Sequence, residues 1–260
     1  VAYIKKYDSV TNTWTQIGPN PTATVNPTTF AARIFGAVSL LIDENNVPWI
    51  AGLMMTTLAD TGATMDFFKY NAGAYDLVAG TTTNGIREAH MVLVKTGFNA
   101  GKIYIITYNT SVSSKAVVFN YDKNATTPSW GTSSTISTGA TSYIRINSDT
   151  SGNLYASFRE TVTINPPRIR KLLNSSGASW TDLADVSYTA NAGIDAASSW
   201  QSIDVGQSPN PYIIYYQSSS TKPVVRLYVP LIATAPATAI TNTGATLGGE
   251  VLAALAEAAE

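Results

Sequence analysis

The feature that most constrains the fold of this chain is an internal repeat. Four segments share a polar turn followed by an apolar strand with one aromatic residue, and these aromatic residues are Trp49, Tyr104, Tyr155 and Tyr212. They are spaced 55, 51 and 57 residues apart. Self-similarity at a nearly fixed period indicates a repeat architecture, in which each unit packs mainly on its neighbours. The chain is therefore expected to be a row of similar units.

The turns divide each unit into four strands. Short runs rich in Val, Ile, Tyr, Phe and Thr alternate with turns of Gly, Asn, Asp and Pro, which is typical of antiparallel β-structure. The second strands contain the repeated aromatic residues, and a further aromatic opens each fourth strand. First strands are expected at Gly36–Ile42, His90–Val94, Tyr143–Ile146 and Trp200–Asp204, and third strands at Met65–Tyr70, Ala116–Tyr121, Arg168–Leu173 and Val224–Val229.

These units predict an all-β fold, and their period favours a β-propeller built from four-stranded blades that pack face to face. No helical periodicity occurs up to residue 230. A β-sandwich and an open solenoid are the competing all-β architectures. The period favours the propeller over both.

The two ends of the repeat do not match. Residues 1–18 supply only a third and a fourth strand, Val1–Tyr7 and Trp14–Gly18, whereas the last unit has three strands and no turn with Trp to mark a fourth. The N-terminal pair could complete the last blade and close a four-bladed ring; otherwise the ring has five or more blades. We favour five, because Val224–Val229 already occupies the third-strand place that closure requires.

The sequence changes character after residue 230. We expect the propeller to span residues 1–230, and residues 231–260 to form a linker and the start of a following β-module, or a docking tail. Residues 233–251, a Pro-containing linker and a strand pair, resemble the opening of the fibronectin type III-like modules of bacterial surface proteins. Residues 252–260 depart from that pattern, because Ala, Leu and Glu favour a helix. Helix and strand both stay open for this tail.

The repeat itself resembles the kelch-like and sialidase-like propellers of bacterial surface and secreted proteins. In those propellers Tyr-Asp-x-x-x-x-x-Trp and Gly-Asn-x-Tyr units recur, as they do here from Tyr7 to Trp14 and from Gly152 to Tyr155. The resemblance covers roughly residues 1–230 and concerns the fold. Because propellers support many functions, function must be argued from a site.

Composition excludes several classes of function. The chain has no Cys and one His, which excludes thiol nucleophiles, Cys-ligated zinc and His-rich metal sites. Its 16 Lys and Arg residues form no basic run and the net charge is −1, so nucleic acid is not an expected partner. No uncharged apolar run, Val38–Ile42 included, approaches the roughly 18 residues that membrane insertion needs. We expect no cofactor and no bound metal.

The candidate site lies where each unit enters its first strand. In a propeller these entry loops gather on the face around the central channel, which is where ligands usually bind. The entries here contain three Arg, one Glu, the single His and two aromatic residues. Arg binds carboxylate or sulfate through two hydrogen bonds, and Trp and Tyr offer flat faces to sugar rings. The expected ligand-binding residues are Arg33, Arg87, Glu88, His90, Tyr143, Arg145, Trp200 and Gln201.

The leading hypothesis is a non-catalytic binding or adhesion module, extracellular or on the cell surface, for a glycan or protein partner. The alternative is a glycan-acting hydrolase. The sialidase resemblance implies an Arg triad, a Tyr nucleophile with Glu and an acidic proton donor, but the Asp-box pattern Ser-x-Asp-x-Gly-x-Thr-Trp is absent. A second alternative is an architectural subunit that self-associates through its terminal strands. No residue is predicted to be catalytic.

Overall fold

The chain is all-β, as its sequence predicts. The computed structural model describes residues 4–18, 34–55, 64–80, 86–110, 113–126, 130–161, 167–183, 198–205, 211–217, 221–234, 238–241, 244–246 and 249–257. Every regular element in these ranges is a strand. In this part of the chain no helix is long and apolar enough to cross a bilayer.

Four antiparallel sheets of four strands follow one another along the chain. The first sheet contains β3 (Ile34–Ile42), β4 (Pro48–Met55), β5 (Thr64–Asn71) and β6 (Ala74–Gly80). The second contains β7 (Ile86–Leu93), β8 (Lys102–Asn109), β9 (Lys115–Asp122) and β10 (Ser134–Thr135). The third contains β11 (Ala140–Ser148), β12 (Leu154–Thr161), β13 (Pro167–Leu172) and β14 (Thr181–Asp182). The fourth contains β15 (Ser198–Asp204), β16 (Tyr212–Gln217), β17 (Lys222–Thr234) and β20 (Gly249–Glu257).

Two hairpins complete the described structure. β1 (Lys5–Asp8) pairs with β2 (Thr13–Gln16), and β18 (Thr238–Thr241) pairs with β19 (Gly244–Thr246). The predicted four-strand unit is thus confirmed in the first three sheets, and the N-terminal pair forms a hairpin; the fourth sheet has a fourth strand that the sequence of the last unit did not predict. The fourth strands β10 and β14 are shorter than expected, because Trp130 forms only an isolated bridge with Tyr121 and Trp180 precedes β14.

The repeated aromatic residues lie in the second strand of every sheet, and in two sheets an aspartate fixes the turn before them. Oδ1 of Asp43 accepts two backbone N–H groups of its own turn, and Oδ2 accepts the indole N–H of Trp49 at 3.0 Å. Asp149 binds its turn in the same way and accepts the hydroxyl of Tyr155 at 3.1 Å. The turn and the aromatic ring are therefore one structural unit, which explains why they repeat together.

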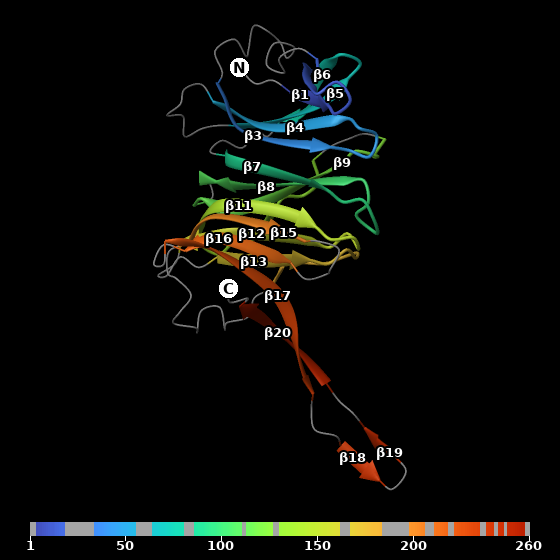
Figure 1. The fold of residues 1–260 in the computed structure, drawn as a ribbon, viewed down its shortest axis with the longest axis vertical. Helices are drawn as coiled ribbons and strands as arrows, with labels where there is room; N and C mark the ends of the chain where they lie inside the picture. The colour runs from blue at the N-terminus through green and yellow to red at the C-terminus, as the bar shows by residue number, and fades with distance from the viewer. Residues whose placement is uncertain are drawn as a thin grey trace.

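Neighbouring sheets bury both of their faces in a stack (Figure 1). On β8, Ile103 and Ile105 pack toward the first sheet, whereas Tyr104 and Ile106 pack toward the third. This division follows from the alternation of side chains along a strand. A third cluster joins Tyr155 of β12 to the fourth sheet. Two-sided burial gives a physical reason for the low charged fraction of 13%.

The first strands of the sheets lie side by side, with β3 next to β7, β7 next to β11, and β11 next to β15. The first and fourth sheets lie at opposite ends of the stack (Figure 1), and the described strands make no extensive contact that would close it into a ring. Both ends expose apolar side chains by 36–50%, namely Val38, Leu40 and Ile42 on β3 and Tyr212, Ile214, Tyr216 and Val225 on the fourth sheet.

The C-terminal segment belongs to the fourth sheet. β17 continues through residue 230 to Thr234, and β20 pairs with it from Gly249 to Glu257. The part of the tail up to Glu257 is thus a strand, although its Ala and Leu content favours a helix, because pairing with β17 overrides helix propensity. This long hairpin projects from the stack with β18 and β19 at its tip (Figure 1). β20 supplies the fourth strand that the sequence of the last unit seemed to lack.

Candidate functional site

Each first strand contains a β-bulge at the equivalent place. The register with the second strand shifts by one residue between Gly36 and Val38 in β3, between Arg87 and His90 in β7, and between Ser142 and Arg145 in β11. β15 has the same shift between Ser199 and Ser202. A bulge inserts one unpaired residue and redirects the side chains around it. The predicted ligand-binding residues of β7, β11 and β15 lie at these bulges.

Two of the bulged residues have left-handed backbone conformations. Glu88 has φ of 42° and Tyr143 has φ of 53°. Non-glycine residues rarely adopt positive φ, and such strained positions occur preferentially at functional sites. The strain here falls on two predicted site residues in adjacent sheets.

The bulges of β7 and β11 bring four predicted residues into one cluster. Nη1 of Arg145 lies 2.6 Å from Nε2 of His90 and 3.8 Å from Oε2 of Glu88. The same Glu88 oxygen accepts the backbone N–H of Ile144 at 3.3 Å, beside the strained Tyr143. We call Arg87, Glu88, His90, Tyr143 and Arg145 the described rim.

His90 is a neutral hydrogen-bond acceptor in this cluster. Burial, together with the positive charge of Arg145, lowers the pKa of His90 from 6.5 to about 4. At neutral pH its Nε2 lone pair therefore accepts a hydrogen bond from Arg145. That lone pair is the one a general base would need, so the geometry makes His90 a positioning residue for Arg145.

Two residues of the second strands extend the cluster and were not predicted. The guanidinium of Arg159 lies 4.8 Å over the ring of Tyr143, and its Nε donates to Ser142 at 3.1 Å. Tyr108 is the register partner of Arg87, and burial, aided by the charge of Glu88, raises its pKa above the ordinary value. Both lie opposite a bulge, so only knowledge of the register could have identified them.

The structure extends the predicted strands toward the N-terminus. His90, Tyr143 and Arg145 lie inside β7 and β11, as the expected strands His90–Val94 and Tyr143–Ile146 require, and Arg87 and Glu88 also lie inside β7 rather than in a loop before it. The first strands begin before the bulge and continue through it. Trp200 and Gln201 lie in β15, but their side chains are outside the described structure. Arg33 lies outside the described residues altogether.

Arg87 differs from Arg145 in its surroundings. Arg145 also donates to the backbone carbonyl of Ile144 at 2.6 Å, so it ties the second sheet to the third. Arg87 is half-buried and forms no ion pair with any other described side chain. Arg87 is therefore the rim cation best able to pair with an incoming anion.

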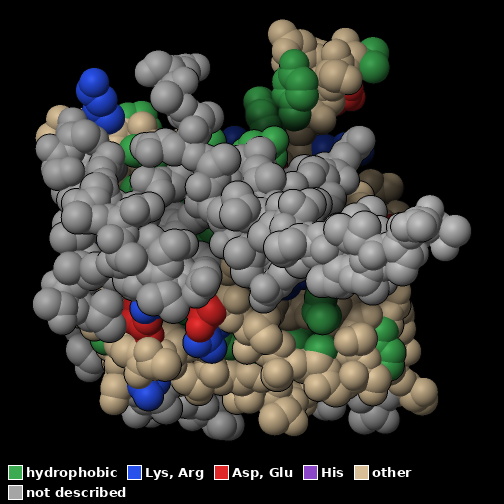
Figure 2. Space-filling view, turned by 90° about the horizontal axis from the view of Figure 1, so that it is seen from below, with side chains coloured by type: hydrophobic (Ala, Val, Ile, Leu, Met, Phe, Trp, Pro, Cys, Tyr) green, Lys and Arg blue, Asp and Glu red, His purple; other side chains and the backbone are tan. Residues whose placement is uncertain are grey.

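The acidic turns serve the structure. Both carboxylate oxygens of Asp43 are occupied by its own turn and by Trp49, and Glu44 forms an ion pair with Lys123 of the next sheet. Throughout the described ranges, no three Asp, Glu or His side chains are grouped as metal ligands. On the face shown in Figure 2, visible acidic side chains lie beside basic ones.

No protein-family model and no curated protein matches this sequence. A protein of unknown function from Dyadobacter fermentans has a similar structure, with a TM-score of 0.55 at 10% identity over 88% of this chain and 60% of that chain. A GH43_1 enzyme from Xanthomonas citri in complex with xylotriose gives a TM-score of 0.43 at 10% identity, over 88% and 75%. The leech intramolecular trans-sialidase also gives 0.43, at 11% identity, over 95% and 39%.

At these identities the likeness concerns the fold alone, and of these three structures the Dyadobacter protein is the one with a TM-score above 0.5. This chain spans about 60% of the length of that protein. The kelch-like and fibronectin-like resemblances stay predictions.

Proposed function

We propose that this chain is a binding module that holds an acidic glycan at the described rim, and that its four sheets are consecutive blades of a β-propeller. The observation that supports the site most strongly is the repeated bulge, which places the strained Glu88 and Tyr143 next to Arg145 and His90. Strain of this kind is retained where the surrounding structure is used for function.

The charge of the rim favours an anionic ligand. The rim holds two cations, Arg87 and Arg145, and one carboxylate, Glu88, which faces Arg145. Arg159 adds a third cation over the ring of Tyr143, and His90 is neutral. An Arg fork binds a carboxylate through two charge-assisted hydrogen bonds. Tyr143 adds an aromatic ring of the type that packs on a sugar face, held in place by Arg159. A uronic or sialic acid unit has both features, an anionic group and a ring.

Binding explains the rim better than hydrolysis does. Glycoside hydrolysis uses two carboxyl groups that flank the bond to be cleaved, about 5–9.5 Å apart. Among the described rim residues Glu88 is the one carboxylate, and it already accepts the N–H of Ile144 and faces Arg145. The nitrogen of His90 is engaged as well. Location outside the cell is part of this proposal, and the Ser-, Thr- and Asn-rich composition is of a kind associated with secreted and surface proteins.

The propeller assignment rests on the connectivity of the sheets. Each sheet is a meander whose first strand contacts the first strand of the next sheet, and each internal sheet is packed on both faces. Blades of a propeller have this arrangement around a central axis. The exposed apolar faces at the two ends of the stack fit surfaces that a closed ring would cover.

The test is isothermal titration calorimetry with trigalacturonic acid and with galactotriose, which are an anionic and a neutral trisaccharide. We expect binding of trigalacturonic acid that weakens at high salt. Arg87→Ala should reduce its affinity by about ten-fold, the loss of roughly one charged hydrogen-bond contact. Lys5→Ala removes the same charge from exposed β1 and serves as the control.

Equal affinities in Arg87→Ala and Lys5→Ala would refute the rim as the site. Absence of binding by the wild-type protein would refute the acidic-glycan proposal. Release of new reducing ends from trigalacturonic acid would instead favour the hydrolase alternative.

A further inference from the structure

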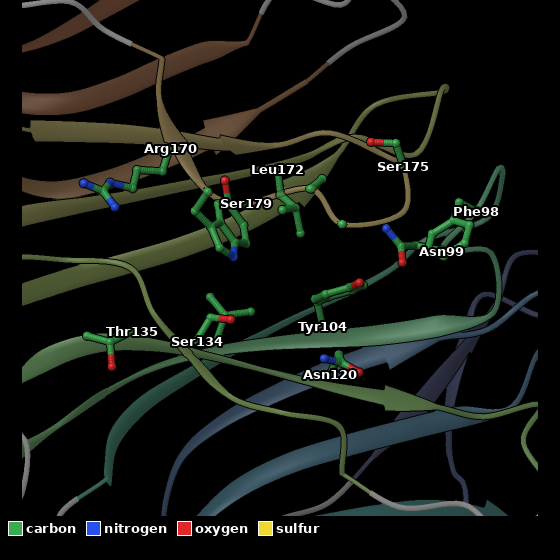
Figure 3. Close-up of a pocket in the computed structure, with 14 residues that line it drawn as sticks. Phe98, Asn99, Tyr104, Asn120, Ser134, Thr135, Arg170, Leu172, Ser175 and Ser179 are labelled. Carbon is green, nitrogen blue, oxygen red and sulfur yellow. The ribbon is translucent and has the colours of Figure 1, made fainter.

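A second hollow lies away from the rim, in a groove between the second and third sheets. Its volume is about 480 Å³. Tyr104, Asn120 and Ser134 of the second sheet form one wall, and Arg170 of β13 with the turn of residues 175–180 forms the other (Figure 3). The groove lies within the size range of about 300–1,000 Å³ that is usual for small-ligand sites.

The equivalent space between the first and second sheets is filled with aromatic rings. There the ring of Trp130 lies 5.5 Å from Phe67, 5.9 Å from Phe119 and 5.9 Å from Tyr121. Trp180 takes the place of Trp130 at the next interface, since each follows the third strand of its sheet. Trp180 is half-buried, packs against the core between the two sheets and lines the groove.

Smaller and polar side chains replace the other three rings. The strand registers pair Lys69 with Trp49, Asn120 with Tyr104, and Lys171 with Tyr155, so these three third-strand positions are equivalent. Counting from them, Val118 replaces Phe67, Arg170 replaces Phe119 and Leu172 replaces Tyr121. The groove therefore arises from defined substitutions within the repeat.

One further substitution uncovers the aromatic wall of the groove. In the first and third sheets the paired lysine, Lys69 or Lys171, lies 5.2 Å over the centre of the second-strand ring. In the second sheet the partner of Tyr104 is Asn120, which lines the groove and brings amide groups in place of a cation. Among the first three sheets, the second alone lacks this lysine, and its aromatic residue is the one that faces the groove.

The charged side chains at the groove are already paired. Arg170 makes two hydrogen bonds to the carboxylate of Asp182, at 2.9 and 3.2 Å. Lys102 donates to Asn99 at 3.1 Å and lies 5.3 Å from the ring centre of Phe98, which is 60% exposed. Arg170 is the one charged side chain among the described residues that line the groove, which otherwise offers hydroxyl groups, amides and aromatic faces. Lys102 lies beside the groove and has neutral partners.

We propose that this groove is a binding site for a neutral saccharide, separate from the rim. Sugar hydroxyls both donate and accept hydrogen bonds, which matches the amide of Asn120 and the hydroxyls of Ser134 and Ser179. The apolar face of a sugar ring matches Trp180. An anionic ligand finds no free cation in the groove, because Asp182 neutralises Arg170.

Saturation-transfer NMR with maltotriose, cellotriose and galactotriose at about 10 mM tests this proposal, since weak saccharide sites have millimolar dissociation constants. The blocked variant is Val118→Phe/Asn120→Lys, which installs the residue types found at the equivalent positions of the first sheet. We expect at least one of the three sugars to bind the wild-type protein. In the blocked variant its dissociation constant should rise by at least about ten-fold.

Arg87→Ala is the matched control, because it alters the rim and leaves the groove intact. The neutral sugar should bind this variant as it binds the wild type, and trigalacturonic acid should bind the blocked variant as before. A thermal unfolding transition within a few degrees of wild type shows that the blocked variant is folded. If the double variant is unfolded, the single variant Asn120→Lys replaces it as the blocked variant, because the side chain of residue 120 lies on the groove wall. Failure of all three sugars to bind, or equal affinity in the blocked variant, would overturn the proposal.

Discussion

Asn174 joins the turns of the second and third sheets, and its removal gives a sharp test of how the sheets are held together. Its Nδ2 donates to the carbonyl oxygens of Thr96 at 3.0 Å and Ser151 at 2.5 Å. Its Oδ1 accepts the backbone N–H of Asn99 at 2.9 Å. Two of its three partners belong to the second sheet's turn, so the Asn174→Ala variant loses most of this connection.

The magnitude follows from these three contacts. A hydrogen bond contributes about 0.5–1.5 kcal/mol net, and partial exposure of the donors places these three near the lower half of that range. We therefore expect Asn174→Ala to lower the free energy of unfolding by about 2 kcal/mol. Gly97 offers a matched perturbation, because its φ is +75° and an added Cβ would overlap Nδ2 of Asn174.

The two changes should be coupled. In the wild-type background, Gly97→Ala lowers the free energy of unfolding by about 1–2 kcal/mol because of the left-handed backbone. The overlap with Asn174 lowers it further. In the Asn174→Ala background the overlap is gone, so Gly97→Ala should cost about 1 kcal/mol less there. Urea unfolding, with m-values that stay unchanged, measures the free energies of unfolding of the wild type, the two single variants and the double variant. A loss below about 0.5 kcal/mol for Asn174→Ala, or an identical cost of Gly97→Ala in both backgrounds, would refute this account.

Further predictions concern the titrating groups. The pKa of His90 is about 4 in the folded protein, below its ordinary 6.5, so the unfolded chain binds a proton that the folded chain lacks. The neutral His90 therefore favours the folded state fully above pH 6.5, and this contribution to the free energy of unfolding is lost as the pH falls to about 4. In His90→Gln the free energy of unfolding, measured with urea, should change less between these two pH values. Arg145→Met should raise the pKa of His90, which the imidazole NMR signals of the single His report directly; an unchanged pKa would exclude Arg145 as a cause. Burial acts to raise the pKa of Glu160, but hydrogen bonds from Gly139 and Thr138 lower it overall. Glu160→Gln should therefore cost about 2 kcal/mol at pH 7, measured by thermal unfolding, and much less near pH 3; an equal cost at both pH values would contradict the assigned role of the carboxylate.

The sequence predicted the repeat well because its signals are local. The turn before Trp49 and the ring of Trp49 are joined through Asp43, so the pattern and the structure coincide. The lengths of the fourth strands were harder to predict from the sequence, since β10 and β14 have only two residues each. β20 was missed because its pairing with β17 is a tertiary contact that residue propensity does not encode.

The sequence singled out residues that the structure brings together, but it did not predict their geometry. Arg and aromatic residues at strand entries drew attention to Glu88, His90, Tyr143 and Arg145, and the structure joins them through the contacts of Arg145 and the backbone bond of Glu88. The bulges that create this cluster were not predicted, because a strand on either side of a bulge is too short for a change in the phase of its alternation to stand out. The partner Arg159 depends on that register and was missed for the same reason.

The most direct test of the central claim is an NMR titration of the imidazole of His90 with trigalacturonic acid. The chain has one His, which lies 2.6 Å from the Arg145 guanidinium, so its signals report on the rim without ambiguity. Binding at the rim predicts a saturable shift of these signals, with the dissociation constant that calorimetry gives. In Arg87→Ala this dissociation constant should be about ten-fold higher. Calorimetric binding without any shift of the His90 signals would place the ligand elsewhere and contradict the proposed site.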